Sequence, residues 1–264
     1  MLHTIRHGDG LPVRFVLVHG LASNARMWDG VGLALAELGH GSIAVDLRGH
    51  GGSPKPDDGY DFDSVVGDLL PLLRSGRVLE DRPVVAGQSY GGNVVVHLAA
   101  THPELVAGIA CVDGGAIELQ RTFPVLDDCI AALRPPYERF VGTPAADYER
   151  FLRATHTDWP ETGIQGALAC HQVDTDGRIQ VFLTWERHRQ IIEAMWHQRV
   201  SALWPTIEVP VQFVMASDRM KSAVDEAVAA LPHGRAHWFD GAHHDVHAQK
   251  PVEVAALLAA MVSS

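Results

Sequence analysis

The sequence predicts an α/β fold with a doubly wound, mostly parallel sheet and an inserted helical cap. Short, almost wholly apolar runs recur along the chain, and helical spacing of apolar residues follows them. Strands that are apolar throughout are typical of a parallel sheet covered by helices on both faces. This alternation of apolar runs and helical spacing stops after residue 115 and resumes at residue 207. We therefore expect a core domain of residues 1–115 and 207–264 and a cap of residues 116–206.

The composition suits one large domain and argues against several classes of partner. The chain has 264 residues, of which 47% are hydrophobic, and a formal net charge of -11. Such a charge repels phosphates, so we expect no nucleic-acid partner. No run approaches membrane-spanning length, the N-terminus has no apolar leader, and the three cysteines show no disulfide framework. We expect a soluble, cytoplasmic protein that acts on a small molecule away from membranes; the sequence sets no oligomeric state.

The first part of the chain reads as alternating strands and helices. The expected elements are strands over residues 2–6, 13–18 and 42–46, and helices over 24–38 and 62–73. The glycine-rich loop after the third strand lacks the Gly-Lys-Ser/Thr ending of a phosphate cradle. We interpret it as a structural turn in which Asp46 and Arg48 hold neighbouring backbone.

The centre of the chain carries the strongest chemical signal. Gly87-Gln88-Ser89-Tyr90-Gly91 follows an apolar run and precedes a helical one, and it fits the Gly-x-Ser-x-Gly pattern of a nucleophile elbow. A serine in such a strained turn needs small neighbours, and the helix start favours a developing anion. Ser89 is the predicted nucleophile. The pentapeptide alone leaves a plain strand-to-helix turn as the alternative.

The remaining elements bring polar residues to one edge of the sheet. We expect strands over 106–112, 209–215 and 236–239, core helices over 91–100, 223–231 and 252–262, and cap helices over 145–154, 163–170 and 184–203, with a tight turn at 174–177. Ligands of such sheets bind at the carboxyl ends of the strands. His19, Ser89 and Asp113 follow three strands at that edge. The cap begins directly after Asp113, so it should lie over the edge.

A nucleophilic serine needs a base and a carboxylate that orients the base. Ser89, Asp218 and His244 meet the order serine, acid, histidine, and each follows a strand. Asp113 ends a neighbouring strand and is the alternative acid. His243 is the alternative base, although the segment up to Pro251 favours His244.

The chain resembles the capped serine hydrolases of the α/β-hydrolase superfamily, which are esterase- or lactonase-like, almost from end to end. His19-Gly20-Leu21 resembles the family's oxyanion loop, Val209 to Arg219 its acid strand, and Gly241 to Pro251 its histidine loop. The resemblance implies that the backbone amides of Leu21 and Tyr90 form the oxyanion hole. Two departures stand out: His243 replaces a frequent glycine, and the usual first strand is missing.

Three aromatic side chains are the predicted substrate-binding residues. Trp28 lies close in sequence to the oxyanion loop, and Trp185 and His188 belong to the cap, where packing against the core is the alternative. The histidines near the C-terminus lack a recognisable ligand set, so we expect no metal. The reaction also requires no cofactor.

We therefore expect a serine hydrolase that cleaves a small, largely apolar carboxylic ester or lactone through an acyl-enzyme. A serine elbow argues against chemistry that needs a carboxylate nucleophile. The alternatives are hydrolysis of a carbon–carbon bond in a diketone-like substrate and, in a different class, a non-catalytic ligand-binding protein of the same fold.

Overall fold

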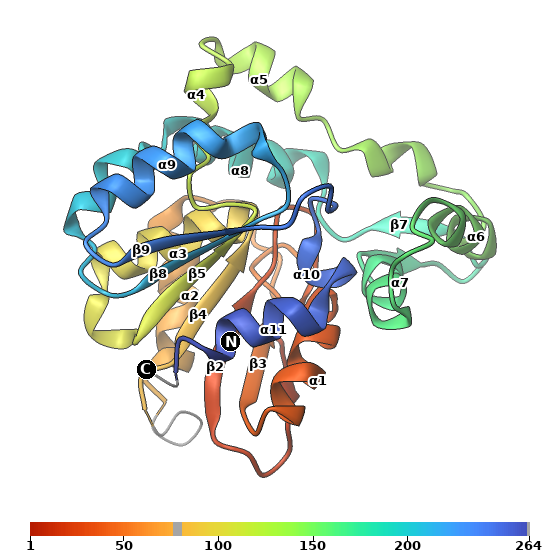
Figure 1. The fold of residues 1–264 in the computed structure, drawn as a ribbon. Coiled ribbons are helices and arrows are strands. Elements are labelled where there is room, and N and C mark those ends of the chain that lie inside the picture. The colour runs from red at the N-terminus through yellow and green to blue at the C-terminus, as the bar shows by residue number, and fades with distance from the viewer. Residues whose placement is uncertain (76–80, 263–264) are drawn as a thin grey trace.

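A seven-stranded sheet covered by helices on both faces forms the core of the protein (Figure 1). The computed structural model describes residues 1–75 and 81–262, without the side chains of residues 136 and 137. The strand order is β1-β3-β2-β4-β5-β8-β9; β1 is antiparallel to β3, and the other pairs are parallel. The bounds are β1 Thr4–His7, β2 Val13–Val18, β3 Gly41–Val45, β4 Val84–Gln88, β5 Gly108–Val112, β8 Val211–Met215 and β9 Gly234–Trp238. The predicted mostly parallel sheet is confirmed.

Adjacent residues of one strand contribute to two different cores. In β2, Phe15 and Leu17 pack with one cluster, whereas Val16 and Val18 pack with the other. Successive side chains of a strand point to opposite faces, so a strand covered on both faces is apolar at almost every position; Arg14 is the one exception in β2. One face carries α1 (Asp29–Glu37) and α11 (Pro251–Ala259); the other carries α2 (Phe62–Leu73), α3 (Tyr90–Thr101) and α9 (Lys221–Ala230).

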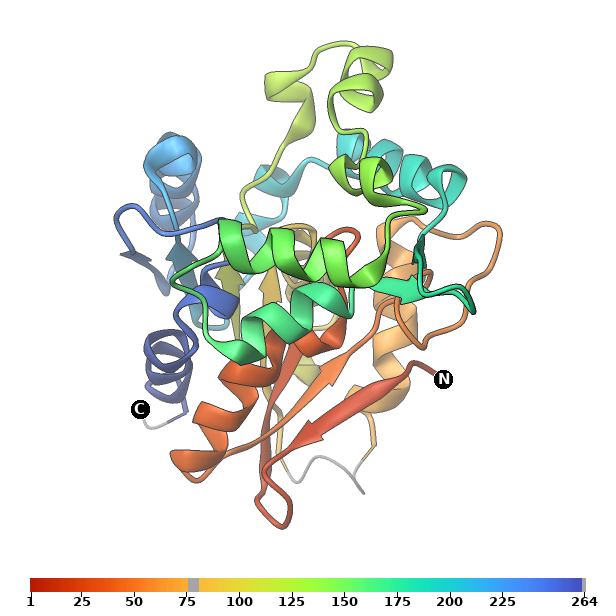
Figure 2. The same ribbon diagram turned by 90° about the vertical axis from the view of Figure 1, so that its right-hand side faces the viewer.

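Residues 116–206, which lie between β5 and β8, are called the insertion below. It contains α4 (Leu119–Thr122), α5 (Leu126–Ala132), α6 (Ala145–Thr155), α7 (Glu161–Leu168), α8 (Trp185–His197) and the antiparallel strands β6 (His171–Val173) and β7 (Ile179–Val181). The tight turn predicted at residues 174–177 joins the two strands, and Gly177 has a φ of 74°. Three-residue strands have no detectable period, so this pair escaped prediction. Figure 2 shows α6 and α7 lying against each other on one side of the molecule.

No helix in the described part of the chain is long and apolar enough to cross a membrane.

Candidate active site

Ser89 lies at the tip of the turn that joins β4 to α3. Its backbone has a φ of 53° and a ψ of -117°, a conformation that is costly for a residue with a side chain. The Ser89 amide donates to the carbonyl of Val112 at 2.9 Å, which ties the turn to the end of β5. A Cβ atom on Gly87 would lie 2.1 Å from the carbonyl oxygen of Gly91. Glycine at position 87 is therefore required by the close approach of strand and helix.

Asp113 follows β5, and its carboxylate connects the ends of three adjacent strands. Its Oδ2 lies 2.5 Å from Nδ1 of His244, in the loop after β9. Its Oδ1 accepts a hydrogen bond from the amide of Ala216, after β8, at 3.0 Å. The φ of Asp113 is 42°, a second strained backbone position beside Ser89. The carboxylate thus has both oxygens engaged and a fixed direction.

The structure corrects the predicted partner of His244. We expected Asp218, but Asp218 is exposed and opens the short 3-10 helix η6 (Asp218–Met220). Among the described residues, no hydrogen bond joins Asp218 to His244, and Asp113 holds the imidazole instead. β8 ends at Met215, the amide of Ala216 binds Asp113, and Asp218 lies two residues further on, in η6.

The surroundings of His244 make it the stronger base of the two adjacent histidines. Burial alone would lower the pKa of His244, but its bond to Asp113 and the charges of Asp245 and Asp113 raise that pKa above the usual value. About half of its side-chain surface, 51%, remains exposed. Gln88 donates from Nε2 to the His244 carbonyl at 3.3 Å, which fixes this loop on the elbow.

His243 has a different environment. Its Nδ1 accepts a hydrogen bond from the amide of Asp245 at 3.1 Å, and its ring meets those of His156 and Trp159 edge to face. Burial is the largest of the effects that lower its pKa. His243 is therefore part of a wall rather than a partner of the carboxylate.

The loop after β2 holds the first expected oxyanion donor, the amide of Leu21. His50 accepts a hydrogen bond from the Ala22 amide at Nε2, at 3.1 Å, and donates from Nδ1 to the Arg48 carbonyl at 2.9 Å. Burial lowers the pKa of His50 to about 3, which keeps the ring neutral and able to accept. Ala22 itself has a φ of 58°. His50, which the sequence reading did not single out, thus fixes a strained loop.

This loop packs directly on the elbow. A Cβ atom on Gly20 would lie 3.2 Å from the Cβ of Ser89. No hydrogen bond among the described residues has the Leu21 amide as its donor. Tyr90 is the first residue of α3, so its amide has no intrahelical acceptor. The ring of Tyr90 is buried near Phe62 and does not line the cavity described next.

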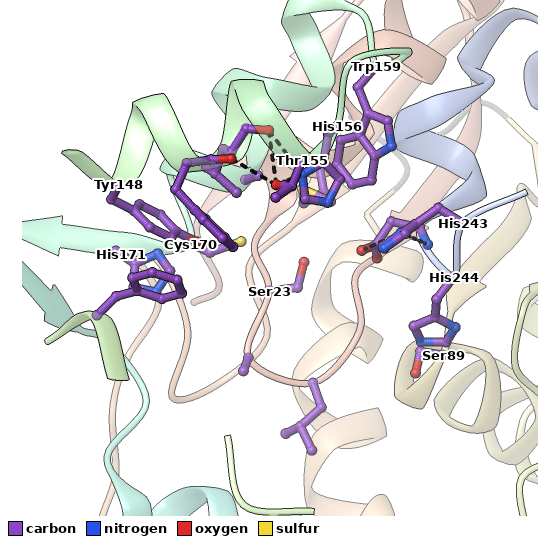
Figure 3. Close-up of a pocket in the computed structure, with 18 of the residues that line it drawn as sticks. Ser23, Ser89, Tyr148, Thr155, His156, Trp159, Cys170, His171, His243 and His244 are labelled. Atoms are coloured by element: carbon purple, nitrogen blue, oxygen red, sulfur yellow. Dashed lines mark hydrogen bonds and ion pairs between the residues drawn. The ribbon is translucent and has the colours of Figure 1, made fainter. Parts of the chain in front are cut away.

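Ser89 and His244 open into one cavity of about 460 Å³. Figure 3 shows both side chains on one side, with Tyr148, His156, Trp159 and His171 of the insertion across the space. The lining residues are Leu21, Ala22, Ser23, Met27, Gln88, Ser89, His243, His244 and Asp245 of the core and Arg139, Phe140, Tyr148, Phe151, Leu152, Thr155, His156, Trp159, Ala167, Cys170 and His171 of the insertion. Its size is that of a small-molecule site.

The three predicted substrate-binding side chains do not line this cavity. Trp28 is fully buried, with its ring centroid 4.4 Å from that of His247. Trp185 stacks on His188, and His188 donates from Nε2 to the Leu133 carbonyl at 3.1 Å. Nearness in sequence to the oxyanion loop was misleading for Trp28, because this last residue of the 3-10 helix η1 (Ala25–Trp28) is buried in the apolar cluster that contains Phe15 and Leu17.

The wall opposite Ser89 was missed in the sequence. It consists of aromatic and histidine side chains from residues 139–171. The occurrence of these residue types in and around the predicted helices over 145–154 and 163–170 was the available signal, but their common direction depends on how α6 packs on α7.

No metal site is visible among the described residues. They contain no group of three or more His, Cys, Asp or Glu side chains that could hold an ion. His237 packs edge to face on Phe239, and His247 lies against Trp28.

Comparison with known proteins places these features in context. Residues 15–257 match the model of the alpha/beta hydrolase family. Esterase YbfF of Escherichia coli is 27% identical over 239 residues, which cover 89% of this chain and 87% of the esterase. Lipase LipV of Mycobacterium tuberculosis is 35% identical over 133 residues, 50% of this chain and 49% of the lipase, so this match spans about half of that relative.

Solved structures agree on the fold. The crystal structure of E-2-(acetamidomethylene)succinate hydrolase aligns over 100% of both chains, with a TM-score of 0.79 and 20% sequence identity. At this identity the likeness concerns the architecture alone.

Proposed function

The chain belongs to the alpha/beta hydrolase family, and we propose that it is a serine hydrolase of small, largely apolar carboxylic esters or lactones. The observation that carries the proposal is the hydrogen bond of Asp113 to His244, with His244 and Ser89 lining one cavity. A carboxylate, an imidazole and a serine in a strained turn are the parts that nucleophilic acyl transfer needs.

The reaction begins with attack of Ser89 Oγ on the substrate carbonyl. His244 takes the hydroxyl proton at Nε2, and Asp113 accepts the hydrogen bond from Nδ1–H, which fixes the tautomer and stabilises the imidazolium. The amides of Leu21 and Tyr90 bind the oxyanion of the tetrahedral intermediate. His244 then protonates the leaving alcohol, and the acyl group remains on Ser89.

Hydrolysis of the acyl-enzyme repeats these steps with water. His244 removes a proton from the water molecule that attacks the ester of Ser89, and the second intermediate collapses to the acid and free serine. Each proton taken up by His244 is returned, so the residues named suffice and no cofactor enters the reaction.

The insertion acts as a cap in this proposal. Its residues supply the wall of the cavity that faces Ser89 and His244, and two phenylalanines and a leucine make part of that wall apolar. A wall of this kind limits the size of the acyl or alcohol group and keeps bulk water from the acyl-enzyme.

The test is turnover of nitrophenyl esters, aliphatic lactones and a vinylogous diketone by the wild type and Ser89→Ala. We expect ester or lactone hydrolysis that falls by orders of magnitude in the variant. Unchanged turnover in Ser89→Ala contradicts the mechanism, and diketone cleavage alone contradicts the substrate class. Binding without any turnover points to a non-catalytic protein.

A further inference from the structure

One cationic side chain, that of Arg139, lines the cavity without forming an ion pair with a described residue. Arg139 is the only arginine or lysine among the described lining residues. It takes part in none of the ion pairs of the described chain, whereas other arginines of the insertion, such as Arg134, Arg150 and Arg153, each pair with a carboxylate. Arg139 is therefore available to a charge that enters from outside.

Aromatic rings hold this guanidinium in place. Its Cζ lies 4.7 Å from the ring centroid of Phe140 and 5.5 Å from that of Phe151, and these two rings are 4.9 Å apart. Both phenylalanines also line the cavity. A guanidinium next to aromatic rings does not use its N–H groups as hydrogen-bond donors to a charged partner there, and these groups can bind a carboxylate with two parallel hydrogen bonds.

A second polar group belongs to the same wall. Tyr148 lies 4.8 Å, ring to ring, from Phe140 and lines the cavity. Phe140 is thus a neighbour of both Tyr148 and Arg139, whose Cζ lies 4.7 Å from the same ring. Burial raises the pKa of Tyr148, so its phenol stays neutral. The neutral phenol can donate one more hydrogen bond to an anion.

We propose that Arg139 binds a carboxylate of the substrate, so that the preferred esters or lactones carry one negative charge beside an apolar body. This inference rests on the proposed hydrolase activity and names its substrate class. The formal net charge of the chain is -11, and Asp245 also lines the cavity, so the general field disfavours anions. Selectivity for a carboxylate must then come from Arg139 itself.

The first experiment compares matched substrates on Arg139→Met, which keeps the apolar stem and removes the charge. Mono-4-nitrophenyl glutarate and 4-nitrophenyl pentanoate differ only in the terminal carboxylate of the acyl chain. The butanoates of 4-hydroxybenzoate and 4-cresol place the same difference on the alcohol side. For one of the pairs, we expect kcat/KM of the charged member to fall about 10- to 100-fold while the neutral member changes less than about threefold.

Two further variants separate charge from structure. Arg139→Lys keeps the positive charge but loses the planar guanidinium that can bind a carboxylate with two hydrogen bonds. The kcat/KM of the charged substrate should therefore lie between those of the wild type and Arg139→Met. Arg150→Met removes an exposed arginine of α6 that pairs with Asp147 and does not line the cavity, and it should leave both members of each pair unchanged. Equal changes for the charged and neutral esters in Arg139→Met, or no change for either, overturn the proposal.

A binding measurement keeps this inference distinguishable from the proposed function. Titration calorimetry with glutarate on the wild type and Arg139→Met requires no turnover. Weaker binding to the variant supports the carboxylate site even where Ser89→Ala leaves hydrolysis unchanged. If glutarate binds equally to both proteins and hydrolysis still depends on Ser89, the carboxylate-binding role of Arg139 is overturned and the proposed hydrolase activity is not.

Discussion

At the scale of single residues, the proposed chemistry depends on the contact between Asp113 and His244. Replacement of the aspartate by asparagine keeps the shape but offers the wrong hydrogen-bonding partner to Nδ1. We expect Asp113→Asn to reduce kcat by about 10³- to 10⁴-fold, as loss of a triad carboxylate does elsewhere. The matched control is Asp218→Asn, which should stay within a few-fold of the wild type. A severe loss in Asp218→Asn with a mild one in Asp113→Asn would reverse the assignment.

The same contact sets the pH dependence. The pKa of His244 is raised, and protonated His244 cannot accept the serine proton, so kcat/KM must fall as the pH drops through a value above 6.5, the ordinary pKa of histidine. Asparagine at position 113 removes a raising effect while burial continues to lower the pKa. The residual activity of Asp113→Asn should therefore show its acid limb at a lower pH. If the acid limb of Asp113→Asn lies at the same pH as that of the wild type, the limb does not report the protonation of His244.

The sequence predicted Ser89, His244 and Asp218 as one site; the structure has Ser89 and His244 lining one cavity, and the carboxylate that contacts His244 is that of Asp113. Ser89 and His244 stand in recognisable turns, whereas Asp113 and Asp218 each follow a strand within a few residues. What decides between them is the direction of one side chain, fixed by the Ala216 amide and a φ of 42°. Neither property has a signature in the sequence.

At the scale of elements, the loop after β2 depends on His50. His50→Ala removes the acceptor of the Ala22 amide, so the adjacent Leu21 amide should lose its fixed direction. We expect kcat to fall about tenfold or more with a smaller effect on KM, because an oxyanion donor acts mainly in the transition state. His50→Gln can still accept from Ala22 and should recover part of the loss. Equal kcat values in the wild type, His50→Ala and His50→Gln would show that His50 does not position this loop.

The elbow also depends on how closely α3 approaches β2. A Cβ atom on Gly91 would lie 2.5 Å from the carbonyl oxygen of His19. Gly91→Ala should therefore lower the free energy of unfolding by about 1–3 kcal/mol. Gly67→Ala, at an exposed position of α2 with no atom within 4 Å of the new Cβ, should raise it by about 0.5–1 kcal/mol. Denaturant titration measures both, and a stable Gly91→Ala protein argues against the tight junction.

At the scale of the whole molecule, the sheet was predictable and the arrangement of the insertion was not. Inner strands such as β4 and β5 are fully buried, and helices follow them along the chain, so the type of sheet is evident from the sequence. The edge strands β1 and β9 are largely exposed and carry a weaker pattern. The insertion has short elements whose positions depend on contacts with one another, and Trp185 and His188 pack within it instead of facing Ser89. Long-range packing of this kind leaves no periodic pattern.

The size of the cavity leads to a prediction about chain length. A space of about 460 Å³ suits a small substrate and has no room for a long acyl chain in addition. Among 4-nitrophenyl esters, kcat/KM should be highest for short or medium acyl groups and fall for the hexadecanoate. A steady increase with chain length would mean that the insertion opens to expose a larger surface.

The most direct test of the account is chemical labelling of the nucleophile. A 4-nitrophenyl alkylphosphonate should react once per chain, release one nitrophenolate and abolish esterase activity in proportion. Peptide mass spectrometry should find the adduct on Ser89, and Ser89→Ala should remain unlabelled. Full labelling of Ser89 with activity retained, or loss of activity with the adduct on another residue, would contradict the assignment of Ser89 as the nucleophile.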